Sequence, residues 1–174
     1  MAKVPFTKLS LKVNPDVVNL TYNEQTIEVK QYLPVNDKLA LISKVINQAA
    51  DQNNFANPVK TDIYFNLELI QAYTNITFTD KQKEDPCKLY DAFESSGLMA
   101  QIKQAIPQIE LDNLYYNTMR CNDAVYAYKN SAMGIAEAIS TDYENLNLDA
   151  TTIQKALGDP ENMKLLKDVL AKLG

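Results

Sequence analysis

The chain has 174 residues, 46% of them hydrophobic, and a formal net charge of −5. These values predict one globular domain over residues 1–174 and argue against a wholly disordered chain. Because the chain is acidic and Arg120 is its only arginine, we expect no nucleic-acid partner: phosphate and base contacts depend on positive charge and arginine.

The first 33 residues predict a β element. Segments 17–22 and 26–31 are strand-like, and the second alternates apolar and polar residues, so the two predict a β-hairpin. Segment 4–13 has apolar residues without helical spacing, and it either adds a third strand or lies extended. A hairpin alone is marginal in water, so we expect it to pack on a helix or a partner and to leave a strand edge open to another chain.

A helical body is predicted over residues 36–139. Asn57-Pro58 and Asp85-Pro86 each combine a capping side chain with proline at the first helical position, and Thr79 with Gln82 resembles a capping box. These signals, with the apolar spacing, predict helices over residues 36–51, 58–73, 87–95 and 98–105, and a helical turn after Thr79.

The longest helix is predicted over residues 110–139, and we expect the domain to be organised around it. Its apolar residues recur at helical spacing in two adjacent rows, which predicts a wide buried face. Gly134 inside this helix indicates close packing against another backbone, or else a kink. The first row comprises Leu114, Thr118, Cys121, Val125, Tyr128, Ala132, Ile135 and Ile139, and the second comprises Tyr115, Met119, Tyr126, Met133 and Ala136.

Two amphipathic C-terminal helices are predicted over residues 149–174. The predicted fold class is therefore α+β, predominantly α. An N-terminal β-hairpin or small antiparallel sheet precedes a bundle of about six to seven helices around the long helix over residues 110–139.

The sequence contains no pattern that indicates catalysis, a metal or a cofactor. The chain has no histidine, which is the commonest general base and metal ligand, and its four glycines are isolated, so no phosphate-binding loop is present. Cys87 and Cys121 have no zinc-site spacing; they either pair as a disulfide or, as we favour, remain reduced and buried. We therefore predict that the protein is not an enzyme. No export signal or membrane span is recognisable, so we expect a cytoplasmic location without membrane contact.

Protein–protein contact is the remaining class of function. Tyrosine is favoured at interfaces because it combines apolar area with a hydrogen-bonding tip. The clean apolar stripe of the last helix either docks on its own domain or on another chain. The candidate contact residues are Tyr115, Tyr116, Tyr126, Tyr128, Tyr143, Leu166, Val169, Leu170 and Leu173.

The run from Leu20 to Pro34, followed by Asp37-Lys38-Leu39, resembles the opening of small tailed-bacteriophage proteins of the tail assembly chaperone type. The resemblance covers residues 17–50 as a pattern, and the turn departs from it in having Asn-Glu in place of Asn-Gly. It implies a non-enzymatic protein that holds tail or tape-measure protein soluble in the host cytoplasm until assembly. Its partners would be phage tail or virion proteins, or a second copy of itself.

Two alternatives remain open from the sequence. One is a virion component, such as a head–tail joining or capsid-associated protein. The other is an acidic phage inhibitor that binds the basic cleft of a host defence enzyme.

Overall fold

The structure is a computed structural model, and it describes residues 3–50 and 57–137. The chain divides into two units, Met1–Ala127 and Tyr128–Gly174, and each is described by itself. The predicted C-terminal helices over residues 149–174 lie outside the described residues.

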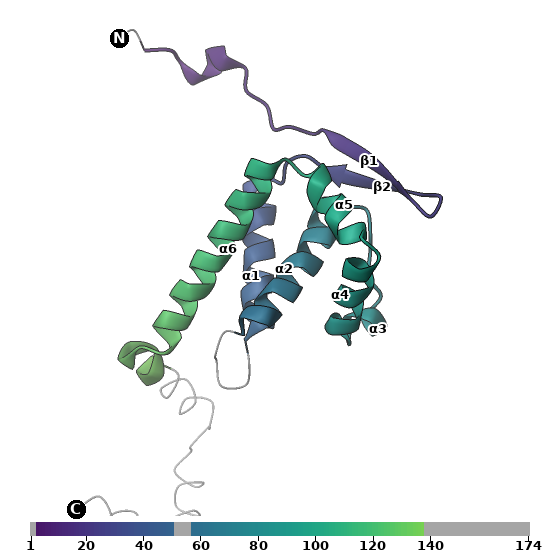
Figure 1. Cartoon of the computed structure of the whole chain (residues 1–174). Coiled ribbons are helices and arrows are strands. Elements are labelled where there is room, and N and C mark those ends of the chain that lie inside the picture. The colour runs from purple at the N-terminus through teal and green to yellow at the C-terminus, as the bar shows by residue number, and fades with distance from the viewer. Residues whose placement is uncertain (1–2, 51–56, 138–174) are drawn as a thin grey trace, which may run out of the picture. The chain divides into compact units, whose positions relative to one another are not determined.

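The predicted fold class, α+β and predominantly α, is confirmed. Two antiparallel strands near the N-terminus precede a series of helices (Figure 1). In chain order the described elements are the 3-10 helix η1 (Phe6–Leu9), β1 (Val17–Tyr22), β2 (Gln25–Lys30), α1 (Val35–Ala49), α2 (Pro58–Tyr73), α3 (Asp80–Lys83), α4 (Pro86–Ser95), α5 (Leu98–Ala105) and α6 (Gln108–Lys129).

The predicted hairpin is confirmed, and its turn contains only two residues. Tyr22 pairs with Gln25, and Asn23 and Glu24 between them have φ angles of 46° and 64°. Two successive positive φ angles define the tight turn that matches the right-handed twist of paired strands. Segment 4–13, which we predicted as a third strand or as extended chain, forms no strand; it contains η1 and is otherwise extended.

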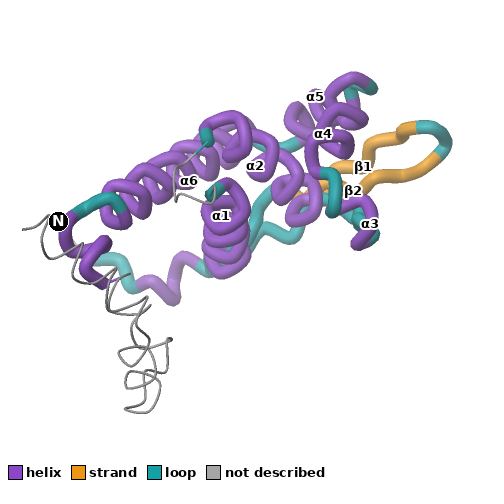
Figure 2. Tube along the Cα trace, turned by 90° about the horizontal axis from the view of Figure 1, so that it is seen from below, coloured by secondary structure: helices purple, strands orange, loops and turns teal. Residues whose placement is uncertain are grey.

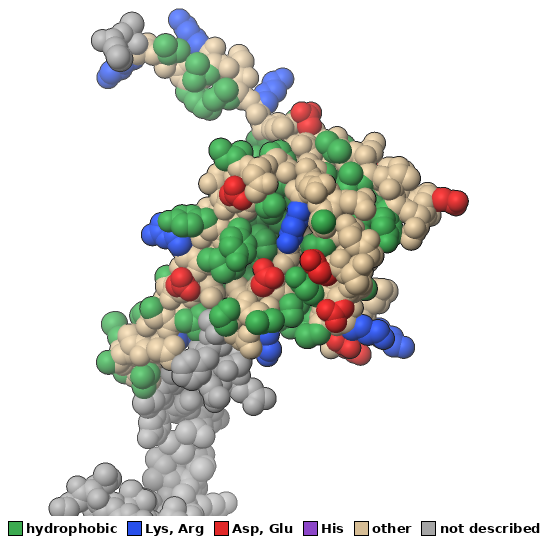
Figure 3. All heavy atoms as spheres, viewed as in Figure 1, with side chains coloured by type: hydrophobic (Ala, Val, Ile, Leu, Met, Phe, Trp, Pro, Cys, Tyr) green, Lys and Arg blue, Asp and Glu red, His purple; other side chains and the backbone are tan. Residues whose placement is uncertain are grey.

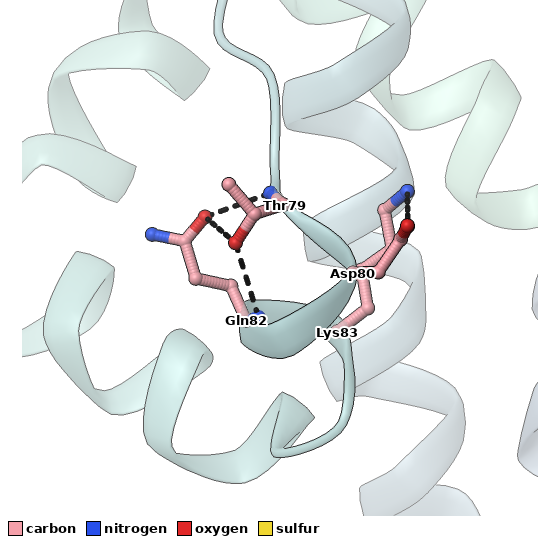
Figure 4. Close-up of polar contacts among 4 residues, drawn as sticks. All are labelled: Thr79, Asp80, Gln82 and Lys83. Carbon is pink, nitrogen blue, oxygen red and sulfur yellow. Dashed lines mark hydrogen bonds and ion pairs between the residues drawn. The ribbon is translucent and has the colours of Figure 1, made fainter.

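The predicted helix starts are confirmed at three sites. The Asn57 side chain accepts hydrogen bonds from the first turn of α2, and Asp85 accepts one from the Lys88 N–H of α4. At α3, the Gln82 N–H donates to Thr79 Oγ1 while the Thr79 N–H donates to Gln82 Oε1, which completes a capping box (Figure 4). Each signal acts within four residues, which is why the sequence alone reveals it.

The core of the first unit is built around α2. In two views, α2 lies beside α1 (Figures 1 and 2). The hairpin, α5, α6 and the linker residues Leu33, Phe78 and Ile106 add the remaining buried side chains. Buried residues occupy every side of α2, as expected for a helix enclosed by its neighbours. They are Thr61, Phe65, Asn66, Leu67, Glu68, Leu69, Ile70 and Tyr73.

Several polar residues are buried because they bond to their own helix. Thr61 Oγ1 donates to the Asn57 carbonyl at 3.0 Å, and Asn66 Nδ2 donates to the Asp62 carbonyl at 2.8 Å. Thr118 in α6 does the same with the carbonyl four residues before it. For Thr61 and Thr118, such local bonds remove most of the cost of burying the hydroxyl. Asn66 is satisfied only in part, because its Oδ1 is buried without a partner among the described residues.

The predicted wide apolar face of the 110–139 helix is wrong. The described part of α6 buries only a narrow stripe at four-residue spacing, and much of this stripe is polar: Glu110, Leu114, Thr118, Asn122 and Tyr126. Helix α6 also ends at Lys129, and the exposed positions include Cys121, Tyr128, Met133 and Ile135. The central position in the described core therefore belongs to α2, whose buried polar residues obscure its apolar pattern.

Gly134 marks the start of a new helical segment. Ser131 Oγ accepts a hydrogen bond from the Gly134 N–H at 3.1 Å and donates one to the Tyr128 carbonyl oxygen. A Cβ atom at Gly134 would lie 2.2 Å from that carbonyl oxygen, far inside contact distance. The close approach is to the chain's own preceding turn, at the point where the predicted helix is interrupted. Of the two predicted explanations, the kink is therefore nearer to the structure than packing against a separate backbone.

Candidate protein-interaction surfaces

The N-terminal arm (residues 3–16) exposes a row of large apolar side chains. They are 51% to 71% exposed, and none belongs to the core: Val4, Phe6, Leu9, Leu11 and Val13. The arm runs from β1 away from the helices, and hydrophobic side chains gather along it (Figures 1 and 3). Its charged residues before Asp16 are Lys3, Lys8 and Lys12, all positive. A contiguous apolar surface of this kind is typical of an interaction site.

The outer edge of β1 is a second open surface. The even-numbered residues of β1 bond to β2, and the Gln31 N–H continues the pattern by donating to the Asp16 carbonyl at 2.9 Å. The backbone N–H and C=O groups of Val17, Asn19 and Thr21 therefore point away from β2. Within the described residues, nothing hydrogen-bonds to these groups. β1 also lacks charged residues. Charged side chains are the usual protection of an exposed strand edge against pairing with another chain.

The outer edge of β2, by contrast, is covered. Thr74 forms a bridge with Val29. The side-chain amide of Asn75 accepts from the Glu28 N–H at 3.2 Å and donates to the Thr26 carbonyl at 3.3 Å. Asn75 thus takes the place of a neighbouring strand, and the open edge of the hairpin is that of β1.

The tyrosines predicted as a contact group have different environments. Tyr126 is buried, whereas Tyr115 and Tyr116 are 44% and 58% exposed. The Tyr115 ring packs edge-on against Phe65, and Arg120 lies over the Tyr116 ring. Tyr128 in the second unit is exposed and donates to a Glu137 carboxylate oxygen, which raises the pKa of its hydroxyl.

The other predicted contact residues lie outside the described residues. They are Tyr143, Leu166, Val169, Leu170 and Leu173, and their role stays a prediction.

Glu110 is a buried charged residue whose carboxylate oxygens both accept hydrogen bonds. Its carboxylate accepts from the Leu33 N–H at 3.1 Å and from the Tyr73 hydroxyl at 2.8 Å, and Lys38 Nζ lies 2.8 Å from both oxygens. Burial by itself would raise the pKa of Glu110, but the bonds from Lys38, Leu33 and Tyr73 outweigh it and lower the pKa. Burial and the bond to Glu110 raise the pKa of Tyr73. With its oxygens occupied, Glu110 on α6 holds α1, α2 and the linker between β2 and α1 together.

A groove of about 530 Å³ lies over α3 and α4. Its polar lining includes Thr79 and Gln82, which cap α3 (Figure 4), and Asp85, which caps α4. Among the residues described, no group of three or more His, Cys, Asp or Glu side chains is placed to hold a metal ion. No helix in the described ranges has the length and apolar character needed to cross a bilayer.

Both cysteines are free and exposed, so the predicted buried state of Cys87 and Cys121 is wrong. Cys87 lies in the first turn of α4, and Cys121 lies beside the narrow buried stripe of α6. The predicted wide apolar face of the long helix included Cys121 and is not formed, whereas no such face was predicted for Cys87.

Comparison with protein-family models, curated proteins and solved structures finds no match for this chain.

Sequence reasoning missed the arm as the main exposed apolar surface. The signal was present: the segment has apolar residues without helical spacing, interleaved with lysines and prolines.

Proposed function

We propose that this chain is a non-enzymatic protein that acts by binding other proteins through its N-terminal arm. The observation that carries the proposal is the row of five exposed apolar side chains on the arm. Docking each of them would contribute about 1.5–3 kcal/mol, offset in part by the cost of ordering the arm. The lysines between them favour a partner with acidic residues around an apolar groove.

The sequence resemblance supports a tail assembly chaperone of a bacteriophage as the specific role. Such a chaperone keeps an aggregation-prone tail or tape-measure protein soluble until assembly. Exposed apolar side chains on a segment outside the core suit this task, because they can adapt to a client without disturbing the helices.

The test is co-expression with the tape-measure protein of the same phage. The full chain should raise the soluble fraction of the client, and the variant Phe6→Ser/Leu11→Ser/Val13→Ser should not. Val59→Ser is the matched control, because Val59 is also 68% exposed but lies on α2. An arm variant that keeps the client soluble as well as the full chain does would refute the proposal.

Two further measurements separate the alternatives. Mass spectrometry of purified particles should not detect the chain; stable incorporation would favour a virion component. Purification from infected cells should recover a phage protein, whereas recovery of a host defence enzyme would favour the inhibitor.

A further inference from the structure

We propose that two copies of this chain pair through the outer edges of β1, as a two-fold symmetric dimer with a four-stranded sheet in the order β2-β1-β1-β2. The inference rests on the strand edge and does not depend on the client-binding role of the arm. Its starting point is the uncharged edge strand with unsatisfied outward backbone groups at Val17, Asn19 and Thr21.

The outward groups of β1 are self-complementary. In an antiparallel pairing centred on Asn19, Val17 lies opposite Thr21 of the second copy, and Asn19 lies opposite its own counterpart. All three residues then exchange N–H···O=C bonds across the two-fold axis. On the core-facing side, the same register sets Val18 opposite Leu20, so the apolar face continues across the junction.

The other edge of the hairpin limits the assembly to two copies. Thr74 and Asn75 already occupy the outer edge of β2, as the bridge to Val29 and the bonds to Thr26 and Glu28 show. A four-stranded sheet made in this way has no open edge left for a third copy. An open strand on one side and a covered strand on the other thus favour a closed dimer over a fibre.

Charge favours this edge over the rest of the surface as the contact between two copies. Residues 16–174 carry 14 Lys and Arg against 22 Asp and Glu, so most other contacts between two copies would bring like charges together. β1 is uncharged, and its symmetric pairing creates no such contact.

The first test is the mass of the purified protein alone, by sedimentation equilibrium over a range of micromolar concentrations. We expect a reversible dimer at twice the chain mass of 19.6 kDa. Asn19→Pro should raise the dissociation constant at least about tenfold, because proline removes an outward donor and blocks the edge. It takes no bond from the hairpin, since the Asn19 N–H points away from β2. Asn19→Thr keeps the N–H and is the matched control. A monomer at every concentration would overturn the proposal.

The second test maps the register by oxidative cross-linking, with Cys87 and Cys121 replaced by serine. Asn19→Cys should form an intermolecular disulfide, because directly opposed residues in such a pair have Cα atoms about 5.5 Å apart. Val17→Cys alone should not, because its counterpart lies four residues along the ladder, about 14 Å away. Cross-linking through residue 17 but not residue 19 would contradict the register. Because neither test contains a client, a failed chaperone assay leaves these results unaffected, and a failed dimer assay leaves the arm proposal standing.

Discussion

Replacing Glu110 by glutamine tests the buried charged cluster that joins α1, α2, α6 and the linker between β2 and α1. The carboxylate accepts from the Leu33 amide and the Tyr73 hydroxyl, and it pairs with Lys38. Its side chain is only 10% exposed, so water cannot replace these donors. Glutamine preserves the shape and one acceptor oxygen, but it directs an NH₂ group toward the lysine ammonium.

The expected loss of unfolding free energy follows from the number of hydrogen bonds whose acceptor is no longer charged. Hydrogen bonds to ionised groups contribute about 1.5–3 kcal/mol, and neutral ones about 0.5–1.5 kcal/mol. The variant weakens the bonds from Leu33 and Tyr73 and loses the one from Lys38, whose side chain is 22% exposed and can turn to water. We therefore expect Glu110→Gln to lower the free energy of unfolding by about 3 kcal/mol at neutral pH, at the lower end of the range for a broken buried pair.

The effect should depend on pH in a definite direction. The folded-state pKa of Glu110 is lowered, so the group stabilises the fold at pH values above its unfolded pKa of about 4.3. That contribution is lost as the pH falls through the folded-state pKa. The difference between the wild type and Glu110→Gln should therefore be constant above about pH 5 and shrink below about pH 4.

The assay is urea unfolding followed by far-ultraviolet circular dichroism at several pH values. Asp112→Asn is the matched control: its carboxylate bonds to the Gln108 side chain on the exposed side of α6, so we expect a change within about 0.5 kcal/mol. A loss below about 1 kcal/mol for Glu110→Gln at neutral pH, or one that does not change with pH, would refute the reasoning.

Three further predictions follow from single positions. Glu24→Gly should stabilise the protein by about 1 kcal/mol, because Glu24 has a positive φ of 64° that glycine adopts without strain. Thermal melts measure the change, and a lower melting temperature would contradict the positive φ at this position of the turn. Leu69→Ala in α2 should cost about 3 kcal/mol in urea unfolding, whereas Val59→Ala in the exposed first turn of the same helix should cost less than about 0.5 kcal/mol. Equal costs would mean that the body of α2 is not enclosed. Cys87 and Cys121 should both react with a thiol reagent in the folded protein, and reaction only after unfolding would show that they are buried.

Local signals in the sequence were sufficient for the helix starts. Asn57-Pro58 and the Thr79 capping box act within one turn, and neither depends on residues far along the chain. The hairpin was also predictable, although its Asn-Glu turn lacks the usual glycine, because the alternation in β2 defines which face is buried.

The arrangement of the core could not be read from periodicity. Asn66 and Thr118 bond to their own helices and face the core, so burial follows tertiary contacts more closely than residue polarity. The end of α6 depends on Ser131 turning back to the Tyr128 carbonyl, a bond that no spacing rule reveals. The exposure of the arm was not predicted, because the apolar residues of segment 4–13 fit a third strand as well as an extended chain.

Hydrogen–deuterium exchange of the full chain, alone and with its co-purified partner, tests the central claim most directly. Binding through the arm predicts that backbone amides in residues 3–16 exchange quickly in the free protein and become protected in the complex. Protection confined to α6 around Tyr115 and Tyr116, with the arm still exchanging freely, would contradict the account.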